Sequence, residues 1–198
     1  LEAIKYAKDG YTILLVGHKG HDEVIGTMGE APDNTILVES VEDIPLLNIP
    51  NSEKVVALTQ TTLSVSDTAN IISALKEKFP KLVTRNDICY ATTNRQNALD
   101  SITDDVDLVL VVGAKNSSNS NRLKELASER GIEAYLVNGP EDVQLDWLEG
   151  KSSIGITSGA STPEVLVNGV IEKIKPSNIQ NIVYAEENVN FKLPKEVV

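Results

Sequence analysis

The segment "GHKGHDEVIGT" (17–27) carries side chains whose types and spacing suit proton transfer or anion binding. His18 and His21 are the only histidines of the chain, and Glu23 follows His21 by two residues. An imidazole and a carboxyl group in one loop can exchange protons or hold a charged ligand near neutral pH. A loop histidine is also a common structural hydrogen-bonding residue, and this pair lacks a third nearby ligand for a metal ion.

The segment "GAKNSSNSNRL" (113–123) places serines and asparagines between an apolar run and an expected helix. Ligands of parallel sheets bind beyond the carboxyl ends of the strands, where helix N-termini favour anions. We therefore expect a phosphate or diphosphate ligand, although N-capping alone also explains any one such loop. Neither GxxxxGK[ST] nor GxGxxG occurs. Four polar loops follow apolar runs in this way: His18–Gly29, Thr59–Ser64, Asn116–Asn121 and Ser158–Thr162.

Cys89, in "NDICYATTNRQ", is the only cysteine. A single cysteine is most often a small buried hydrophobic residue, but a thiolate can also be a nucleophile or one ligand of an iron–sulfur cluster. The residue types alone leave these alternatives open. With one cysteine no internal disulfide can form, which favours an intracellular, cytoplasmic location.

Composition narrows the function classes. A formal net charge of −11 and a pI of about 4.6 argue against a nucleic-acid-binding surface, which needs clustered Lys and Arg. The longest apolar runs, such as Leu108–Val112, have the length of a strand, so we expect neither a membrane span nor a secretory signal. Hydrophobic and charged contents of 41% and 24% are typical of a globular protein.

Short β-branched runs alternate with amphipathic segments, which indicates an α/β fold built from parallel βα units. The runs are continuous in Val, Ile and Leu, as expected of strands covered on both faces. We predict strands at Thr12–Val16, Thr35–Val38, Lys54–Leu58, Leu108–Val112, Ala134–Val137 and Ser153–Thr157. We predict helices from residue 1 to Gly10 and at Val65–Lys78, Asn94–Ser101, Asn121–Arg130 and Pro163–Lys173.

An internal repeat divides the chain into two homologous small domains, each a short parallel sheet flanked by helices. "ILLVGHKG" matches "LVLVVGAKN", and Gly17 and Gly113 are 96 residues apart. Glu42 and Glu141 are 99 residues apart, and Thr59 and Thr157 are 98 apart. We predict domains at 1–84 and 85–174 and a tail at 175–198 whose alternation over 181–194 suggests an edge strand. Because the chain starts within a helical pattern and the tail lies outside the repeat, we expect that a further domain joined both ends.

Five segments, taken in order, closely resemble the LytB family: "VGHKGHDEVIGTMG", "LTQTTLSVSDT", "ICYATTNRQ", "VVGAKNSSNSNRL" and "GITSGASTPEVLV". These are the hydroxymethylbutenyl diphosphate reductases, the last enzymes of the non-mevalonate isoprenoid pathway. The resemblance implies three similar α/β domains around a central [4Fe–4S] cluster, of which this chain would supply the second, the third and the tail. It also implies reductive dehydroxylation of an allylic diphosphate, with ferredoxin or flavodoxin as electron donor, in the cytoplasm or in a plastid.

The resemblance assigns roles to residues of these segments. Cys89 matches one of three cysteine ligands of the cluster, and His21 matches a histidine that binds the diphosphate. Glu23 matches the acid that supplies protons, and Thr61 matches the threonine that contacts the substrate hydroxyl, flanked by Gln60 and Thr62. His18 would support its loop. The remaining diphosphate-binding residues would be Ser117, Ser118, Asn119 and Ser161.

The chain departs from the family pattern in one respect. The family places two further cluster cysteines and two diphosphate-binding histidines in its N-terminal domain, and this sequence contains none of them. We therefore expect the 198 residues to be inactive by themselves. Two other hypotheses remain: a sugar-phosphate-binding α/β module without redox chemistry, and a thiol hydrolase that uses Cys89 and His21.

Overall fold

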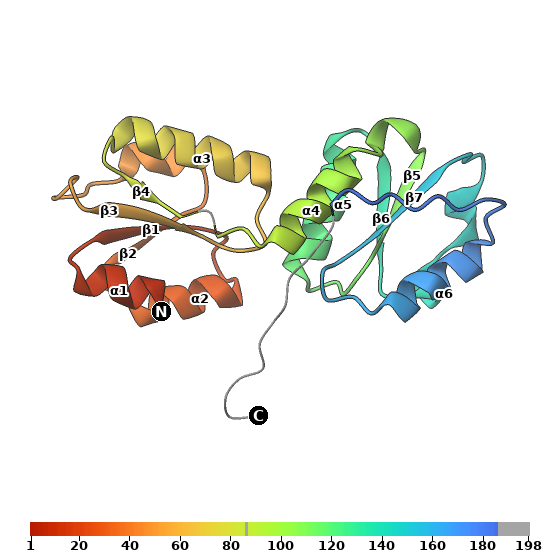
Figure 1. Cartoon of the computed structure of the whole chain (residues 1–198), viewed down its shortest axis with the longest axis horizontal. Helices are drawn as coiled ribbons and strands as arrows, with labels where there is room; N and C mark the ends of the chain where they lie inside the picture. The colour runs from red at the N-terminus through yellow and green to blue at the C-terminus, as the bar shows by residue number, and fades with distance from the viewer. Residues whose placement is uncertain (86, 186–198) are drawn as a thin grey trace, which may run out of the picture.

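Two parallel sheets, each covered by helices on both faces, lie side by side in the computed structural model (Figure 1), which describes residues 1–85 and 87–185. The first sheet has the strand order β2-β1-β3-β4 and the second the order β6-β5-β7. The strands are β1 (Thr12–Val16), β2 (Thr35–Val38), β3 (Val55–Thr59), β4 (Val83–Thr84), β5 (Leu108–Val112), β6 (Glu133–Val137) and β7 (Ile154–Ser158). The predicted α/β class with two small parallel sheets is confirmed.

The two sheets share one topology. In each, the first strand in sequence lies at the centre, between the second and the third, and all the pairs are parallel. This agreement is what the offset of 96 to 99 residues in the sequence predicts. The first sheet differs by the added β4, two residues long, which sequence patterning missed. The predicted domain limits at 84 and 174 stay predictions.

The helices are α1 (Glu2–Lys8), α2 (Asp22–Glu30), α3 (Val65–Lys78), α4 (Tyr90–Asp100), α5 (Ser118–Glu129) and α6 (Glu164–Ile174). Short 3₁₀ helices occur at Val41–Leu46, Thr103–Asp105, Pro140–Asp142 and Leu145–Leu148. In the part of the chain that the structure describes, no helix is both long and apolar enough to cross a membrane.

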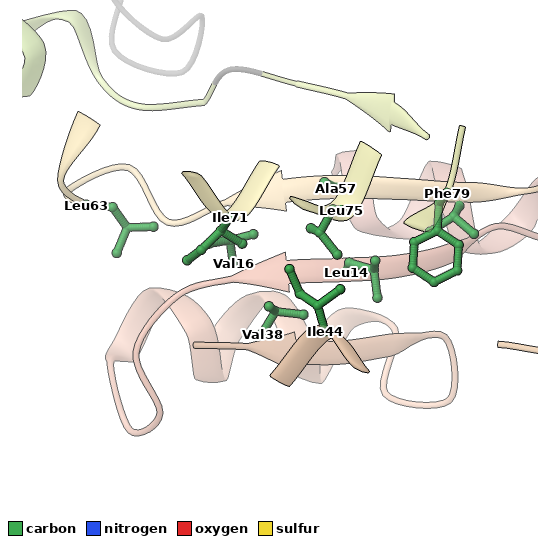
Figure 2. Close-up of a cluster of buried hydrophobic side chains, with 10 residues drawn as sticks. Leu14, Val16, Val38, Ile44, Ala57, Leu63, Ile71, Leu75 and Phe79 are labelled. Atoms are coloured by element: carbon green, nitrogen blue, oxygen red, sulfur yellow. The ribbon is translucent and has the colours of Figure 1, made fainter. Parts of the chain in front are cut away.

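Alternating side chains of the central strands build the cores on the two faces of each sheet. Leu14 and Val16 of β1 pack beneath α3, where Ile71 and Leu75 cover them (Figure 2). Ile13 and Leu15 point to the opposite face, against α1 and α2. The same alternation in β5 separates a core under α4 and α5 from a core under α6. Burial on both faces explains why these strands read as unbroken apolar runs.

Three expectations about elements were wrong. The segment predicted as the polar loop His18–Gly29 forms α2 from Asp22 onward, and Gly26 and Gly29 lie inside that helix. The predicted helix Asn94–Ser101 begins earlier, at Tyr90. Its buried stripe consists of Thr92, Gln96 and Leu99, and because two of these are polar, the sequence shows no apolar period there. The predicted edge strand does not form at 181–185, and residues 186–194 lie outside the described residues.

The start of α5 also differs from the prediction, by three residues. Ser117 is the N-cap, and its hydroxyl oxygen accepts a hydrogen bond from the Ser120 N–H at 3.3 Å. Ser118 and Asn119 therefore occupy the first turn of α5 and not a loop. Ser120, which is 1% exposed, is wedged against Gly113 and Gly159 at the carboxyl ends of β5 and β7. A Cβ atom at either glycine would overlap the Ser120 hydroxyl.

We predict that Gly113→Ala destabilises the chain by about 1–3 kcal/mol, the usual cost of overpacking a tight site. The added methyl group would lie 2.8 Å from the Ser120 Cβ atom, so the first turn of α5 must shift away from β5. Gly29→Ala is the control, because nothing lies within 4 Å of a Cβ atom at Gly29 and alanine is the better helix residue. Urea unfolding of both variants measures the difference. Equal stabilities would contradict the tight packing between β5 and α5.

Candidate functional site

The Glu23 carboxylate and Thr61 are joined by three hydrogen bonds across the carboxyl edge of the first sheet. Both carboxylate oxygens of Glu23 accept from the Thr61 backbone N–H, at 3.1 Å each, and Oε2 accepts from the Thr61 hydroxyl at 3.0 Å. Glu23 lies in the first turn of α2, and Thr61 follows β3. The structure therefore brings together the residue that the resemblance assigns to proton supply and the residue that it assigns to the substrate hydroxyl.

His21 is the N-cap of α2, and this role defines its tautomer. The Nδ1 atom of His21 accepts a hydrogen bond from the Glu23 N–H at 3.2 Å. In the neutral imidazole the proton must then lie on Nε2, which is free to donate to an anion. His18 is exposed, and its backbone N–H donates to the Gln60 side chain at 3.0 Å. The structural role expected for His18 thus involves its backbone.

Cys89 lies next to the same residues. Its backbone N–H donates to the Thr61 carbonyl oxygen at 3.0 Å, and the half-buried thiol stands at the N-cap of α4. Among the described residues no group of three or more His, Cys, Asp and Glu side chains could hold a metal ion. The described residues thus offer one thiolate, and a four-iron cluster needs further ligands.

Asp87 is a site residue that sequence analysis missed. A cavity of about 480 Å³ is lined by both Asp87 and the joined pair Glu23 and Thr61. Burial is the largest cause that raises the pKa of Asp87, followed by the negative charge of Glu2 and, to a smaller extent, that of Glu23. A hydrogen bond with the Thr59 backbone lowers the pKa. The only signal in the sequence was its place two residues before Cys89.

Three of the residues assigned to diphosphate binding, Ser117, Ser118 and Asn119, lie at the start of α5, and Ser161 lies between β7 and α6. Ser117 and Ser161 line a second cavity of about 240 Å³ beyond the ends of β5 and β7, together with Thr162. The Ser117 hydroxyl oxygen accepts from the Ser120 N–H and, at 3.1 Å, from the Ser120 hydroxyl, so its own proton can be donated elsewhere. A neutral donor beside a helix N-terminus suits an anion.

Ser118 and Asn119 do not line that cavity. The Ser118 hydroxyl lies at the junction of the two halves, 2.9 Å from Thr62 Oγ1. Asn119 is 5% exposed, and neither its Oδ1 nor its Nδ2 atom has a hydrogen-bond partner among the described residues. Buried amides without partners are rare because each lost hydrogen bond costs about 1–3 kcal/mol. The unpartnered amide of Asn119 indicates a ligand or a residue outside those described.

Side chains of α4 and α5 hold the two halves together beside this site. The buried Gln96 accepts from the Val65 N–H at 3.0 Å and donates to the Leu63 carbonyl oxygen at 2.8 Å. Arg122, whose side chain is 12% exposed, pairs with Asp67 of α3 at 3.2 Å. Sequence patterning provided no signal for these contacts, because each joins positions far apart in the chain.

The family model described as "LytB protein" matches residues 1–175. Curated proteins named 4-hydroxy-3-methylbut-2-enyl diphosphate reductase are 52% identical in Protochlamydia amoebophila, over 98% of this chain, and 49% identical in Actinobacillus pleuropneumoniae, over 100%. The chain spans 64% and 65% of the length of these relatives.

Two solved structures are similar. The E-1-hydroxy-2-methyl-but-2-enyl-4-diphosphate reductase from Plasmodium falciparum aligns with a TM-score of 0.93 and 42% identity, covering 98% of this chain and 64% of that one. A structure of (E)-4-hydroxy-3-methyl-but-2-enyl diphosphate reductase, the terminal enzyme of the non-mevalonate pathway, aligns with a TM-score of 0.50 and 32% identity, covering 87% and 62%.

We predict that Asp87→Asn raises the free energy of unfolding at pH 7. The pKa of Asp87 is higher in the folded state than in the unfolded state, so its contribution to stability is present below pH ~4 and is lost as pH rises. The gain from the variant should therefore disappear at low pH. Urea unfolding between pH 3 and pH 8 measures it.

Asp107→Asn is the control of opposite sign. Hydrogen bonds from the Ser152 and Ser153 N–H groups lower the pKa of Asp107, so its contribution is present above pH ~4 and is lost as pH falls. This variant should lose stability at pH 7, and the loss should shrink toward low pH. Parallel pH dependences for the two variants would contradict the assignment of Asp87.

Proposed function

Because the chain belongs to the LytB family, we propose that it forms the greater part of a 4-hydroxy-3-methylbut-2-enyl diphosphate reductase of isoprenoid biosynthesis. The observation that carries the proposal is the position of Thr61, which is hydrogen-bonded to Glu23 by its N–H and hydroxyl groups and to the backbone of Cys89 by its carbonyl group. The residues that we propose as proton donor and as cluster ligand thus both contact Thr61, the residue that we propose for the substrate hydroxyl.

The reaction needs two electrons and two protons. The allylic C–O bond breaks, the oxygen leaves as water after protonation, and a carbon of the resulting allyl group takes the second proton. A [4Fe–4S] cluster held in part by Cys89 would supply the two electrons and bind the substrate hydroxyl as a Lewis acid. The protein must then orient the substrate and deliver protons.

Glu23 and Thr61 suit the proton delivery. A protonated Glu23 can donate to Thr61 Oγ1 across the observed 3.0 Å, and the Thr61 hydroxyl can pass its own proton to the leaving oxygen. The backbone N–H of Thr61, which holds the carboxyl group in place, keeps the two groups aligned in either protonation state. Asp87 lines the same cavity.

The diphosphate would be bound by neutral donors. His21 Nε2 and the Ser117 and Ser118 hydroxyls each have a proton to donate, and the unpartnered Asn119 amide adds one more donor. Ser161 and Ser117 both line the second cavity. The N-terminus of α5 contributes its dipole and free N–H groups. Ferredoxin or flavodoxin is the class of electron donor that we propose.

We predict that Glu23→Gln lowers turnover by ~10²-fold or more while the variant still binds substrate and its cluster, because glutamine cannot transfer a proton. The assay uses the full-length reductase, meaning these 198 residues joined to the segment that the curated relatives have in addition. Asp22→Asn is the matched control, since it removes the same charge from the exposed neighbour on the first turn of α2. Turnover within a few-fold of the parent for Glu23→Gln would remove the proposed role.

We also predict that the 198 residues alone, reconstituted with iron and sulfide, keep no stoichiometric four-iron cluster, because the sequence contains one cysteine. Iron and acid-labile sulfide analysis after gel filtration measures the content. The full-length reductase is the control and should hold about four irons per chain. A monomer of the 198 residues that holds about four irons would show that other side chains replace the missing thiolates.

A further inference from the structure

Gln60 is a fully buried polar side chain that joins the two halves of the structure. It follows β3 and is 0% exposed. Its Oε1 atom accepts from the His18 N–H at 3.0 Å, in the first half. Its Nε2 atom donates to Thr62 Oγ1 at 3.0 Å and to Ser118 Oγ, in the second half, at 3.3 Å. Every strong donor and acceptor of the amide is therefore used.

The backbone N–H of His18 determines the orientation of the Gln60 amide and thereby the direction of these hydrogen bonds. A backbone N–H such as that of His18 can only donate, so the atom of Gln60 that faces it must be the amide oxygen. The amide nitrogen then faces Thr62 and Ser118 and can only donate to them. Thr62 Oγ1 in turn donates to Ser118 Oγ at 2.9 Å. The Ser118 oxygen thus accepts two hydrogen bonds, and its own proton points elsewhere.

The Gln60 side chain is buried and tightly packed. A Cβ atom at Gly17 would lie 3.2 Å from Gln60 Oε1 and 3.4 Å from Gln60 Cβ, so the backbone after β1 packs directly on this side chain. Breaking any hydrogen bond of a buried amide leaves an unpaired polar group at a cost of about 1–3 kcal/mol. Burial and packing together therefore hold one orientation of the chain of hydrogen bonds from His18 to Ser118.

We infer that Gln60, acting with Thr62, is a positioning residue that presents the Ser118 hydroxyl as a hydrogen-bond donor to the diphosphate of the substrate. The inference rests on the proposed function. Two neighbouring features support this inference. Asn119, whose amide has no hydrogen-bond partner among the described residues, follows Ser118 on α5. His18, at the other end of the chain of hydrogen bonds, lies close to His21 in the sequence. The backbone N–H of His18 in the first half thus fixes, through the Gln60 amide, the direction in which the Ser118 hydroxyl of the second half donates its hydrogen bond.

The test is a double-mutant cycle in the full-length reductase, with the dissociation constant of inorganic pyrophosphate measured by calorimetry. We expect Gln60→Met and Ser118→Ala each to weaken binding about tenfold, within the range for hydrogen bonds to charged groups. If Gln60 acts through Ser118, the double variant should be weakened about tenfold as well, not about a hundredfold. In turnover assays Gln60→Met should raise KM and leave kcat within a few-fold.

Gln96→Met is the matched control for a merely structural role. Gln96 is also a buried glutamine that joins the two halves, but its amide bonds the backbone at Leu63 and Val65 and no hydroxyl of the candidate site. Its effect on pyrophosphate binding should be small and should add to that of Ser118→Ala. Thr62→Val, which removes the other donor to Ser118, gives a second test if Gln60→Met does not fold, and Thr62→Ser should restore binding.

Unchanged pyrophosphate binding in Gln60→Met, or losses that add in the double variant, would overturn the role of Gln60 and leave the proposed function in place. A parent enzyme that turns over substrate but is unaffected by Ser118→Ala would also overturn it. A parent enzyme that binds no pyrophosphate and reduces no substrate would overturn the proposed function itself. The two failures are thus distinguishable.

Discussion

The backbone of residues 60–65, the loop between β3 and α3 with the first residue of α3, must find hydrogen-bond partners because much of the loop is buried. A buried N–H or C=O group without a partner costs about as much as a lost hydrogen bond. The partners come from both halves: Glu23 for the Thr61 N–H, Cys89 for the Thr61 carbonyl, and Gln96 for the Leu63 carbonyl and the Val65 N–H. Pairing the backbone groups of this one loop therefore brings α2 and α4 into contact with the same loop.

The same requirement explains why residues proposed for chemistry are also structural. Glu23 is the acceptor for the Thr61 N–H, so the bond that stabilises the loop also holds the carboxyl group beside the Thr61 hydroxyl. His21 caps α2 with Nδ1, which places the proton of the neutral imidazole on Nε2. Ser117 does the same at α5, where its oxygen is the cap and its proton remains available. Each of these side chains is held in a fixed orientation because one of its atoms already takes part in a structural hydrogen bond.

The charge distribution is consistent with two different environments around the loop. On the Glu23 side, the larger of the two cavities is lined by four acidic side chains, those of Glu2, Glu23, Glu30 and Asp87. On the α5 side, neutral hydroxyl and amide groups line or adjoin the smaller cavity. A chain of net charge −11 would thus meet an anionic ligand through oriented dipoles and a helix N-terminus.

The sequence by itself determined the strands and the repeat. Runs such as Leu108–Val112 are apolar at every position because both faces of a parallel sheet are covered, and that requirement is local and visible. The motif resemblance also determined the family and named Glu23, Thr61 and Cys89 as site residues. Elements with weak or polar patterns were predicted less well. Helix α2 contains Gly26 and Gly29, and the buried stripe of α4 includes Thr92 and Gln96, so neither shows an apolar period.

Only the tertiary structure decided which polar groups meet. Gln60 and Ser118 are 58 residues apart, Thr61 and Glu23 are 38 apart, and the pairing of Arg122 with Asp67 joins two helices of different halves. Asp87 enters the site because it lines the same cavity as Glu23 of α2. A hydrogen bond between distant residues depends on the direction of two side chains after both sheets have packed. Residue type and spacing carry no information on that direction.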